Sequence, residues 1–401
     1  MSRILVLGKF YAPFNGGIER YTTSLCERLA LNHHVTAVVF NHEAGSASEV
    51  RNGVRVRRIG APVRLRGQPL TLNLFGAFDL ADFDLVHFHA PNPLASVALL
   101  CAMARGAAPP VVITHHMDMR PTGPLRWAAR FAYARLLEAS HTVVVSSEKN
   151  IKVSRDLSGD LNYVSIPFGV ISRDYAASDA ERAAAVKWRR SLAGEAQTIS
   201  FLGRHARYKG LDVLVRALAA TPGVHAFIAG DGPYRAPAEI LAQTLAVGDR
   251  AHFLGLVSEA EKRRLFAASD AFVLPSTEIT EAFGIAQLEA MAAGLPVIAS
   301  NLPTGVTDIV IDDVSGLLCA PGDPDSLSAA ITRLTSDETL RRRLALGAQR
   351  HVQENFDEDV VLDRTVQMLE AALRGGQCVR GDVHGLAGGR ALLAQNAIEK
   401  T

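Results

Sequence analysis

Two carboxylates in the second half of the chain have a spacing suited to a ligand that carries both hydroxyls and phosphates. Glu281 and Glu289 lie eight residues apart, and eight helical steps would leave them ~80° apart around one helix, a poor shared face. We therefore expect a helix that begins near Phe283, with Glu281 in the loop before it and Glu289 on the second turn. The N–H groups of Ala282, Phe283 and Gly284 would then be free to donate to phosphate oxygens, beside carboxylates that accept from hydroxyls.

Two cations follow a predicted strand at 198–202. Arg204 and Lys209 flank the start of the next predicted helix, where the helix N-terminus adds positive potential. A planar guanidinium and an ammonium together suit a diphosphate. The alternative is two solvated surface cations. The turn Gly230-Asp231-Gly232-Pro233 ends another strand at the same edge, although alone it indicates only a turn.

A glycine pair ends the first predicted strand of the chain. Gly16 and Gly17 open a helix after strand 4–8, so a ligand could approach the backbone closely and meet free N–H groups. The segment lacks the G-x-G-x-x-G pattern and does not support a dinucleotide-binding turn. An ordinary helix-start turn is the alternative for the pair.

Alternating strands and helices must position these residues. The strands are continuous apolar runs, which is typical of parallel strands covered on both faces, so the pattern predicts doubly wound α/β domains. In the first half we expect strands at 4–8, 35–40, 54–59, 85–89, 111–114, 142–145 and 163–166, with helices at 17–30, 93–104 and 124–139. In the second half we expect strands at 198–202, 224–229, 251–253, 271–275 and 297–300, with helices at 176–192, 211–220, 236–245, 259–267 and 284–293.

The repeat of this pattern predicts two Rossmann-like domains, 1–170 and 171–356, with a cleft between the carboxyl edges of their sheets. A helix at 357–374 is expected to pack back on the first domain. The Gly-rich segment 375–401 has little to bury, and we expect it to be loosely held.

Length and composition exclude several other classes. The chain has 401 residues, 48% apolar and 21% charged, with a net charge of +1, which argues against a disordered chain and against a nucleic-acid partner. Four scattered cysteines form no C-x-x-C pair and favour a reducing, cytoplasmic setting. No signal peptide is evident, and the longest apolar stretch, 93–104, is shorter than the ~20 residues that span a bilayer.

The charge is unevenly distributed between the two halves. Residues 1–170 carry 18 basic and 12 acidic side chains, a net of +6, whereas the rest of the chain carries −5. Basic and aromatic residues interleave in the first half and suit an anionic membrane surface. An ordinary solvated face with a buried tryptophan is the alternative. The residues concerned are Arg51, Arg55, Arg57, Arg58, Arg64, Arg66, Arg126, Trp127, Arg130, Phe131 and Arg135.

Taken together, these motifs resemble those of the family 4 retaining nucleotide-sugar glycosyltransferases, which have the two-domain GT-B fold. The resemblance covers nearly the whole chain before about residue 374. The segment from Glu281 to Ile298 is its most specific part. The other segments are Pro13 with Gly16-Gly17-Ile18-Glu19, Thr114-His115-His116-Met117-Asp118, Gly203-Arg204 with Lys209-Gly210, and Gly230-Asp231-Gly232-Pro233.

The resemblance implies a role for each matching residue. Gly17, Arg204 and Lys209 would hold the donor diphosphate. Glu281, beside the amides of Ala282, Phe283 and Gly284, would bind the hexose and take part in catalysis, and Glu289 would bind the ribose. His116 would act at the acceptor side near the anomeric carbon, with Asp118 beside it. Transfer with retention would need no protein nucleophile, because the leaving phosphate can deprotonate the acceptor.

Two patterns suggest metal sites that we do not favour. Asp82-Phe83-Asp84 spells D-x-D, but alternation along the strand that follows leaves only one carboxylate facing any site, and the cations already neutralise a diphosphate. His87 and His89, with His115 and His116, could suggest zinc, although a strand H-x-H is more often a polar lining, and His115 reads as a core histidine. We expect no metal and no cofactor.

The function that we expect is hexose transfer from a nucleotide diphosphate sugar to a lipid-linked or polysaccharide acceptor, in lipopolysaccharide or related cell-surface glycan synthesis. Gln287 and the segment from Asn301 to Val306 favour a mannosyl or deoxyhexosyl donor, linked to GDP or UDP. The alternatives are an epimerase or hydrolase on the same fold, or a non-enzymatic protein that binds nucleotide sugars. We expect a cytoplasmic protein, peripheral at the inner face of the membrane.

Overall fold

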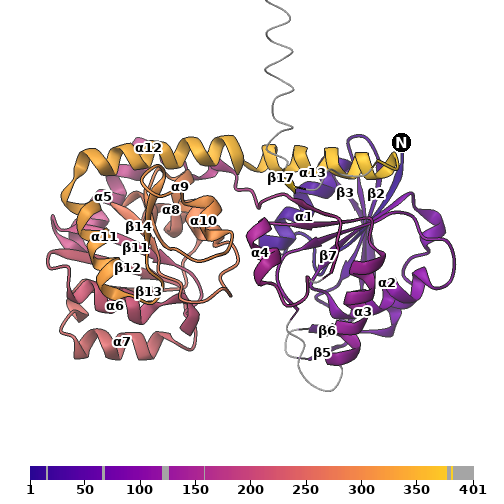
Figure 1. Ribbon diagram of the computed structural model, residues 1–401, viewed down its shortest axis with the longest axis horizontal. Helices are drawn as coiled ribbons and strands as arrows, with labels where there is room; N and C mark the ends of the chain where they lie inside the picture. The colour runs from indigo at the N-terminus through magenta and orange to yellow at the C-terminus, as the bar shows by residue number, and fades with distance from the viewer. Residues whose placement is uncertain (15–16, 66–67, 120–125, 158, 377–380, 383–401) are drawn as a thin grey trace, which may run out of the picture. The chain divides into compact units, whose positions relative to one another are not determined.

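The computed structural model describes residues 1–14, 17–65, 68–119, 126–157, 159–376 and 381–382, and these form two compact units (Figure 1). Met1–Pro167 and the chain from Val361 make the first unit, and Phe168–Val360 make the second. Val170 lies in the second unit because its backbone exchanges hydrogen bonds with Phe356 (2.8 Å) and Glu358 (2.9 Å). The contacts therefore divide the chain before residue 168 and after residue 360, whereas the expected divisions were after 170 and 356.

The first unit is built on a sheet whose described strands run in the order β17-β10-β9-β8-β7-β1-β2-β4-β3. Every pairing is parallel except the edge pair of β3 with β4. A separate antiparallel pair joins β5 to β6. The strands are β1 (Arg3–Leu7), β2 (His34–Phe40), β3 (Ala47–Arg51), β4 (Val54–Ile59), β5 (Val63–Leu65), β6 (Gln68–Leu70), β7 (Leu85–Ala90), β8 (Val111–His115), β9 (Thr142–Val145), β10 (Tyr163–Ser165) and β17 (Gly381–Asp382).

Helices cover both faces of this sheet, as the continuous apolar strands predict. Leu5 and Leu7 of β1 point into the core beneath α2 (Pro93–Met103) and α3 (Arg126–Ala139). Ile4 and Val6 point to the opposite core, under α1 (Gly17–Leu29) and α13 (Glu358–Leu373). The short helix α4 (Glu148–Val153) follows β9.

The C-terminal helix α13 begins in the second unit, and its residues from Val361 onward pack in the first. Its contacts are polar as well as apolar. The Thr365 hydroxyl lies 2.9 Å from the Tyr21 hydroxyl, and Asp363 pairs with Arg28 at 3.3 Å. Most of the segment 375–401 lies outside the described residues.

The second unit has an all-parallel sheet in the order β13-β12-β11-β14-β15-β16 within the described chain. The strands are β11 (Gln197–Leu202), β12 (Val224–Ala229), β13 (Ala251–Gly255), β14 (Ala271–Leu274), β15 (Val297–Ser300) and β16 (Gly316–Cys319). The helices are α5 (Asp179–Ala193), α6 (Leu211–Ala219), α7 (Arg235–Thr244), α8 (Glu259–Ala267), α9 (Ile285–Ala292), α10 (Val306–Ile309), α11 (Pro324–Ser336) and α12 (Glu338–Asn355).

This sheet is also covered on both faces. One core joins its strands to α6, α7 and α11, and two smaller cores join the opposite face to α9 with α10 and to α5 with α8. The strand order places β14 directly beside β11, with β12 and β13 on the other side of β11. The loops that follow β11 and β14 therefore leave the sheet side by side. The predicted pair of doubly wound α/β domains is confirmed.

Candidate functional site

Lys209 and Glu281, assigned above to different parts of one ligand, contact each other directly. Lys209 ends a short 3-10 turn after β11, and Glu281 lies in the loop between β14 and α9. The Lys209 Nζ is 2.5 Å from the Glu281 Oε2, and the Ser276 hydroxyl donates to the same oxygen at 2.9 Å. The two charged side chains are only 13% and 8% exposed. The second carboxylate oxygen, Oε1, has no hydrogen bond within the described residues.

Backbone geometry explains how the two loops approach so closely. Gly210 has a φ of +70°, and a Cβ there would lie 1.9 Å from the carbonyl oxygen of Pro275, in the loop after β14. Only glycine allows this contact without displacing the backbone. The Thr304 hydroxyl donates to the Glu281 carbonyl at 2.8 Å. Both sides of the ion pair are thus held by the fold.

The helix after Glu281 begins at Ile285, two residues later than expected. Gly284 precedes it with a φ of +77°. The N–H groups of Ala282, Phe283 and Gly284 donate no hydrogen bond in the part of the chain that the structure describes. The Phe283 ring itself is buried in the core, so the amide rather than the side chain is available to a ligand.

Arg204 differs from Lys209 in its surroundings. Its side chain is exposed and makes no hydrogen bond or ion pair within the described ranges. The loop that carries Arg204 is bonded to the turn after β12, because the His205 N–H donates to the Asp231 carbonyl at 2.9 Å. The glycine-rich turn after β12 is therefore a support for the Arg204 loop.

Glu289 lies on α9 in a polar network that the sequence does not reveal. Its Oε1 accepts from the Tyr175 hydroxyl and from the Lys262 Nζ, both at 2.6 Å. Lys262 is buried and also pairs with Glu259 at 2.9 Å. No partner of the Glu289 Oε2 is recorded among the described residues. Ser276, Tyr175 and Lys262 were missed because each looks like an ordinary loop or helix-surface residue.

In the first unit, His116 lies in a buried row of imidazoles. It follows β8, and its Nε2 is 3.0 Å from the Nδ1 of His89 on β7, with the rings stacked 5.2 Å apart. Next in the row, His87 contacts the Thr114 hydroxyl at 2.7 Å. Burial, with the nearby His115 and His87, lowers the pKa of His116 to about 3, and burial lowers the pKa of His87 to about 3. These rings are neutral at pH 7 and act through hydrogen bonds.

Asp118 is an anchor for its own loop. Its carboxylate accepts from the Ser154 hydroxyl (2.5 Å), the Arg155 N–H (2.8 Å) and the His115 Nε2 (3.3 Å). Burial would raise the pKa of Asp118, but these hydrogen bonds hold it below its usual range. A contact between Asp118 and an acceptor stays a prediction.

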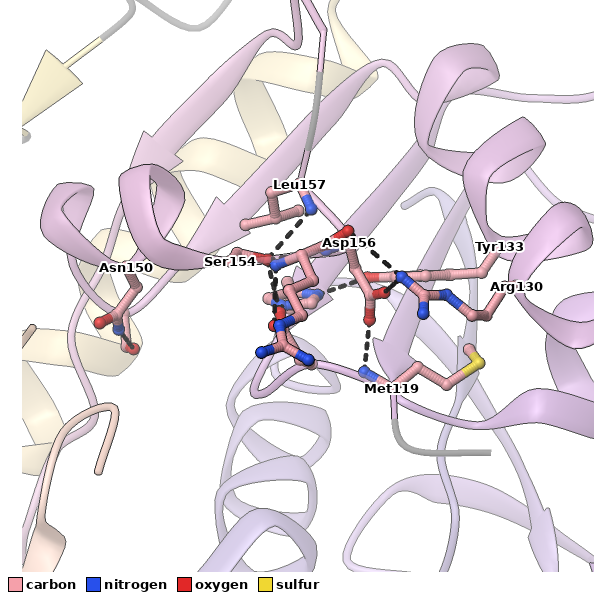
Figure 2. Close-up of polar contacts among 11 residues, drawn as sticks. Met119, Arg130, Tyr133, Asn150, Ser154, Asp156 and Leu157 are labelled. Atoms are coloured by element: carbon pink, nitrogen blue, oxygen red, sulfur yellow. Dashed lines mark hydrogen bonds and ion pairs between the residues drawn. The ribbon is translucent and has the colours of Figure 1, made fainter. Parts of the chain in front are cut away.

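A second carboxylate holds the same loop (Figure 2). Asp156 accepts from the Met119 N–H and pairs with Arg130 at 3.3 Å, while the Leu157 N–H donates to Ser154 at 3.0 Å. The Tyr133 hydroxyl lies 2.6 Å from the His115 Nδ1. Asp118 and Asp156 together fix the residues just after His116.

The remaining predicted residues are placed as follows. Gly17 is the exposed first residue of α1, and Gly16 lies outside the described residues. Asp84 of the D-x-D pattern is bonded to the Arg3 backbone at 2.7 Å and to its guanidinium at 3.3 Å. Within the described ranges, no three or more His, Cys, Asp or Glu side chains are arranged so that they could hold a metal ion.

Several arginines of the first unit make contacts within the fold, and one of them is buried. Arg58 is buried and pairs with Glu49 at 2.6 Å, Arg57 donates to the Ala77 carbonyl, and Arg64 donates to the His42 carbonyl. Arg66 lies outside the described residues, as does the side chain of Arg126. In contrast, Trp127 and Phe131 of α3 are 69% and 63% exposed, so the tryptophan is not buried.

Comparisons with known proteins agree with this architecture. Residues 16–151 match the family model described as Glycosyl transferase 4-like domain, and residues 185–351 match the model Glycosyl transferases group 1. The chain is 27% identical to O-antigen chain mannosyltransferase C of Escherichia coli (92% of this chain, 99% of that protein). It is 29% identical to D-rhamnosyltransferase WbpZ of Pseudomonas aeruginosa (85% and 88%).

The solved structures lead to the same class. Anabaena HepE in complex with UDP-glucose superposes with a TM-score of 0.73 at 22% identity, over 92% of this chain and all of that one. The fold is that of the GT-B glycosyltransferases. With both domain models matched, the chain belongs to the family 4-like glycosyltransferases of this class.

Proposed function

We propose that this protein is a retaining transferase that moves a hexose from a nucleotide diphosphate sugar to a lipid-linked or polysaccharide acceptor. The observation that carries the proposal is the cluster around Glu281. One ammonium, one carboxylate with an unbonded oxygen and three unbonded N–H groups lie together after two adjacent strands. A diphosphate needs the donors, and a hexose needs the acceptor.

Each residue assigned to the donor has a defined part in this proposal. Lys209, Arg204 and the Gly17 amide bind the diphosphate, and the amides of Ala282, Phe283 and Gly284 add further donors. Glu281 Oε1 accepts from hexose hydroxyls, because Lys209 and Ser276 already occupy Oε2. Glu289 binds the ribose through Oε2, because Tyr175 and Lys262 occupy Oε1.

The transfer itself can proceed without a protein nucleophile. The bond from the anomeric carbon to the phosphate oxygen breaks, and the acceptor oxygen forms its bond on the same face of the sugar. The acceptor proton passes to the leaving phosphate oxygen. His116, neutral at pH 7, would donate or accept one hydrogen bond at the acceptor side.

We favour GDP-mannose, or a GDP-linked deoxyhexose, as the donor, and UDP sugars as the second choice. The names of the two bacterial relatives, an O-antigen chain mannosyltransferase and a D-rhamnosyltransferase, support a mannosyl or deoxyhexosyl donor. The complex of HepE with UDP-glucose supports the second choice. Thermal-shift titration with GDP-, UDP- and dTDP-sugars separates these donors, and a donor-only incubation that gives free or epimerised sugar would favour the hydrolase or epimerase instead.

We further propose that no metal or cofactor is required, because cationic side chains and N–H groups surround the diphosphate. Transfer should persist at full rate in excess EDTA. A loss of transfer on chelation that manganese or magnesium restores would contradict this. Asp84 of the D-x-D pattern is bonded to Arg3, so the matched test of a metal at this pattern is Asp82→Asn. This variant should transfer at the wild-type rate.

The first unit is proposed to contact an anionic membrane surface from the cytoplasmic side. No helix in the described part of the chain has both the length and the apolar character to cross a bilayer. The exposed Trp127 and Phe131 lie one helical turn apart on α3, with Arg130 and Arg135 beside them. Binding to phosphatidylglycerol vesicles should fall about 10-fold or more in a Trp127→Ser, Phe131→Ser double variant. Leu346→Ser, which removes an exposed side chain of α12, is the control and should bind like wild type.

A further inference from the structure

A cluster of aromatic rings and cations lies where β1 and β2 end, and none of the roles above uses it. The two strands are parallel neighbours, and the Phe40 N–H donates to the Lys9 carbonyl at 2.9 Å. The segment after β1 carries Lys9, Phe10 and Phe14, while His42 lies just beyond β2. Arg64 reaches the same place from β5.

The rings of Phe10, Phe14 and His42 pack against one another, and we call them the ring cluster. The His42 centroid is 4.4 Å from that of Phe10 and 4.6 Å from that of Phe14, with interplanar angles of 23° and 20°. Phe10 is 7% exposed and forms the buried base. Phe14 is 40% exposed, and His42 is exposed as well. The cluster therefore presents flat apolar ring surface to solvent on a fixed base.

Two cations lie beside the ring cluster. The Lys9 Nζ is 5.7 Å from the Phe10 centroid, and the Arg64 Cζ is 6.0 Å from it. Arg64 is held by its bond to the His42 carbonyl at 2.8 Å, whereas the Lys9 ammonium has no hydrogen bond or ion pair in the described ranges. Burial lowers the pKa of Lys9. The negative charge of Glu19 opposes this shift, whereas the positive charge of Arg64 adds to it. Glu19 forms no ion pair with Lys9, so an anion would relieve an unbalanced positive charge here.

We propose that the ring cluster, with Lys9 and Arg64, binds a phosphorylated sugar unit of the acceptor. The C–H face of a pyranose packs on the exposed rings, and its phosphate accepts hydrogen bonds from the ammonium and the guanidinium. A neutral sugar would leave the cations unpaired, and inorganic phosphate would leave the rings bare. The inference rests on the proposed function, since it names the acceptor class for that reaction. The phosphate can belong to a lipid-linked sugar or to a soluble sugar phosphate.

Calorimetry on the full chain with GDP at saturation, which occupies the donor side, tests this site. The probes are mannose 1-phosphate, methyl α-mannoside and inorganic phosphate, with a short-chain alkyl mannosyl phosphate to represent the lipid-linked source. Wild type should bind mannose 1-phosphate about 10-fold or more tightly than either partial probe. If the alkyl mannosyl phosphate binds more tightly than mannose 1-phosphate, the phosphate belongs to a lipid-linked sugar. If the two bind equally, it belongs to a soluble sugar phosphate.

The variants separate the two halves of the ligand. Lys9→Met should lower the affinity for mannose 1-phosphate by roughly 10- to 100-fold and leave the affinity for methyl α-mannoside unchanged. Lys9→Arg should restore the binding of mannose 1-phosphate. Phe14→Ala should lower the affinity for mannose 1-phosphate and for methyl α-mannoside, and it should leave the affinity for inorganic phosphate unchanged. The controls are Lys152→Met, which removes an exposed lysine of α4, and Leu72→Ala, which removes an exposed apolar side chain of the first unit.

Equal affinities of wild type, Lys9→Met and Phe14→Ala for mannose 1-phosphate would contradict this proposal. The absence of any binding of mannose 1-phosphate to wild type would contradict it as well. Titrations of the same samples with GDP and with UDP keep the two proposals distinct. Binding of either nucleotide with no acceptor probe bound would reject only this inference, whereas a wild-type protein that binds neither nucleotide would reject the proposed function.

Discussion

The two units place chemically different groups at the ends of neighbouring parallel strands. In the second unit, Lys209 and Glu281 follow the adjacent strands β11 and β14 and form a buried ion pair at 2.5 Å. In the first unit, His89 and His116 lie at the ends of the adjacent strands β7 and β8 and form a buried pair of neutral rings at 3.0 Å. The same architecture thus supports a site with full charges and a site without them.

The difference follows from what each site is proposed to bind. A buried ion pair is costly to desolvate and is strongly destabilised when one partner is removed. A diphosphate can replace the carboxylate as the partner of the lysine, so the pair is ready for a charged ligand. An acceptor hydroxyl needs a single neutral hydrogen-bond partner, which a histidine with a pKa of about 3 provides at pH 7.

The largest effect is expected from breaking the charged pair. Lys209→Ala should lower transfer by roughly 100-fold or more, and it should also destabilise the protein by about 3–5 kcal/mol because Glu281 is left buried without its partner. Arg204→Ala, which removes an exposed cation without a partner in the described chain, should weaken donor binding by roughly 10- to 150-fold. Its stability should stay within about 0.5 kcal/mol of wild type. Donor titration and urea denaturation of both variants measure these outcomes.

A Lys209→Met, Glu281→Gln double variant is the control for this prediction. It should recover much of the lost stability, since no buried charge is left alone, and it should remain inactive. Recovery of transfer in the double variant would mean that Lys209 acts only through the fold.

A smaller effect is expected from the neutral pair on acidification. His87 and His116 have pKa values of about 3 in the folded state, against about 6.5 when unfolded. The unfolded chain therefore binds more protons between pH 6.5 and 3, and stability should fall through this window by up to about 1.4 kcal/mol per pH unit for each histidine. Urea denaturation at pH 7.5 and 5.0 measures the slope.

The matched variants are His87→Leu, which removes a buried ring, and His34→Leu, which removes an exposed one. The first should flatten the pH dependence and the second should leave it unchanged. An equal slope in all three proteins would show that the buried histidines do not control acid stability.

Local patterns were sufficient to predict most of the fold. Strands such as β1 and β14 are continuous apolar runs because helices cover both of their faces. The strand β3 was missed because it is an exposed antiparallel edge with no apolar run, and β16 was missed because it begins with glycine, which is uncommon in strands.

The sequence named candidate site residues one by one but did not show which of them contact each other. Motif spacing indicated Lys209 and Glu281 separately, and only the order of β11 and β14 in the sheet brings them together. Lys262 was missed because a lysine at that spacing from Glu259 is typical of a solvated helix surface, whereas in the fold it is buried against Glu289.

The central claim is that the two carboxylates of the second unit contact different parts of the donor. Calorimetry with the free nucleoside diphosphate on Glu281→Gln and Glu289→Gln tests this most directly, because that ligand has the ribose and lacks the hexose. We predict that Glu281→Gln binds it as well as wild type or better, since Lys209 loses a competing carboxylate, while transfer falls by about 10- to 100-fold. Glu289→Gln should bind it about 10-fold more weakly, because a charge-assisted acceptor for the ribose is lost. Weaker binding by Glu281→Gln together with unchanged binding by Glu289→Gln would contradict the assignment.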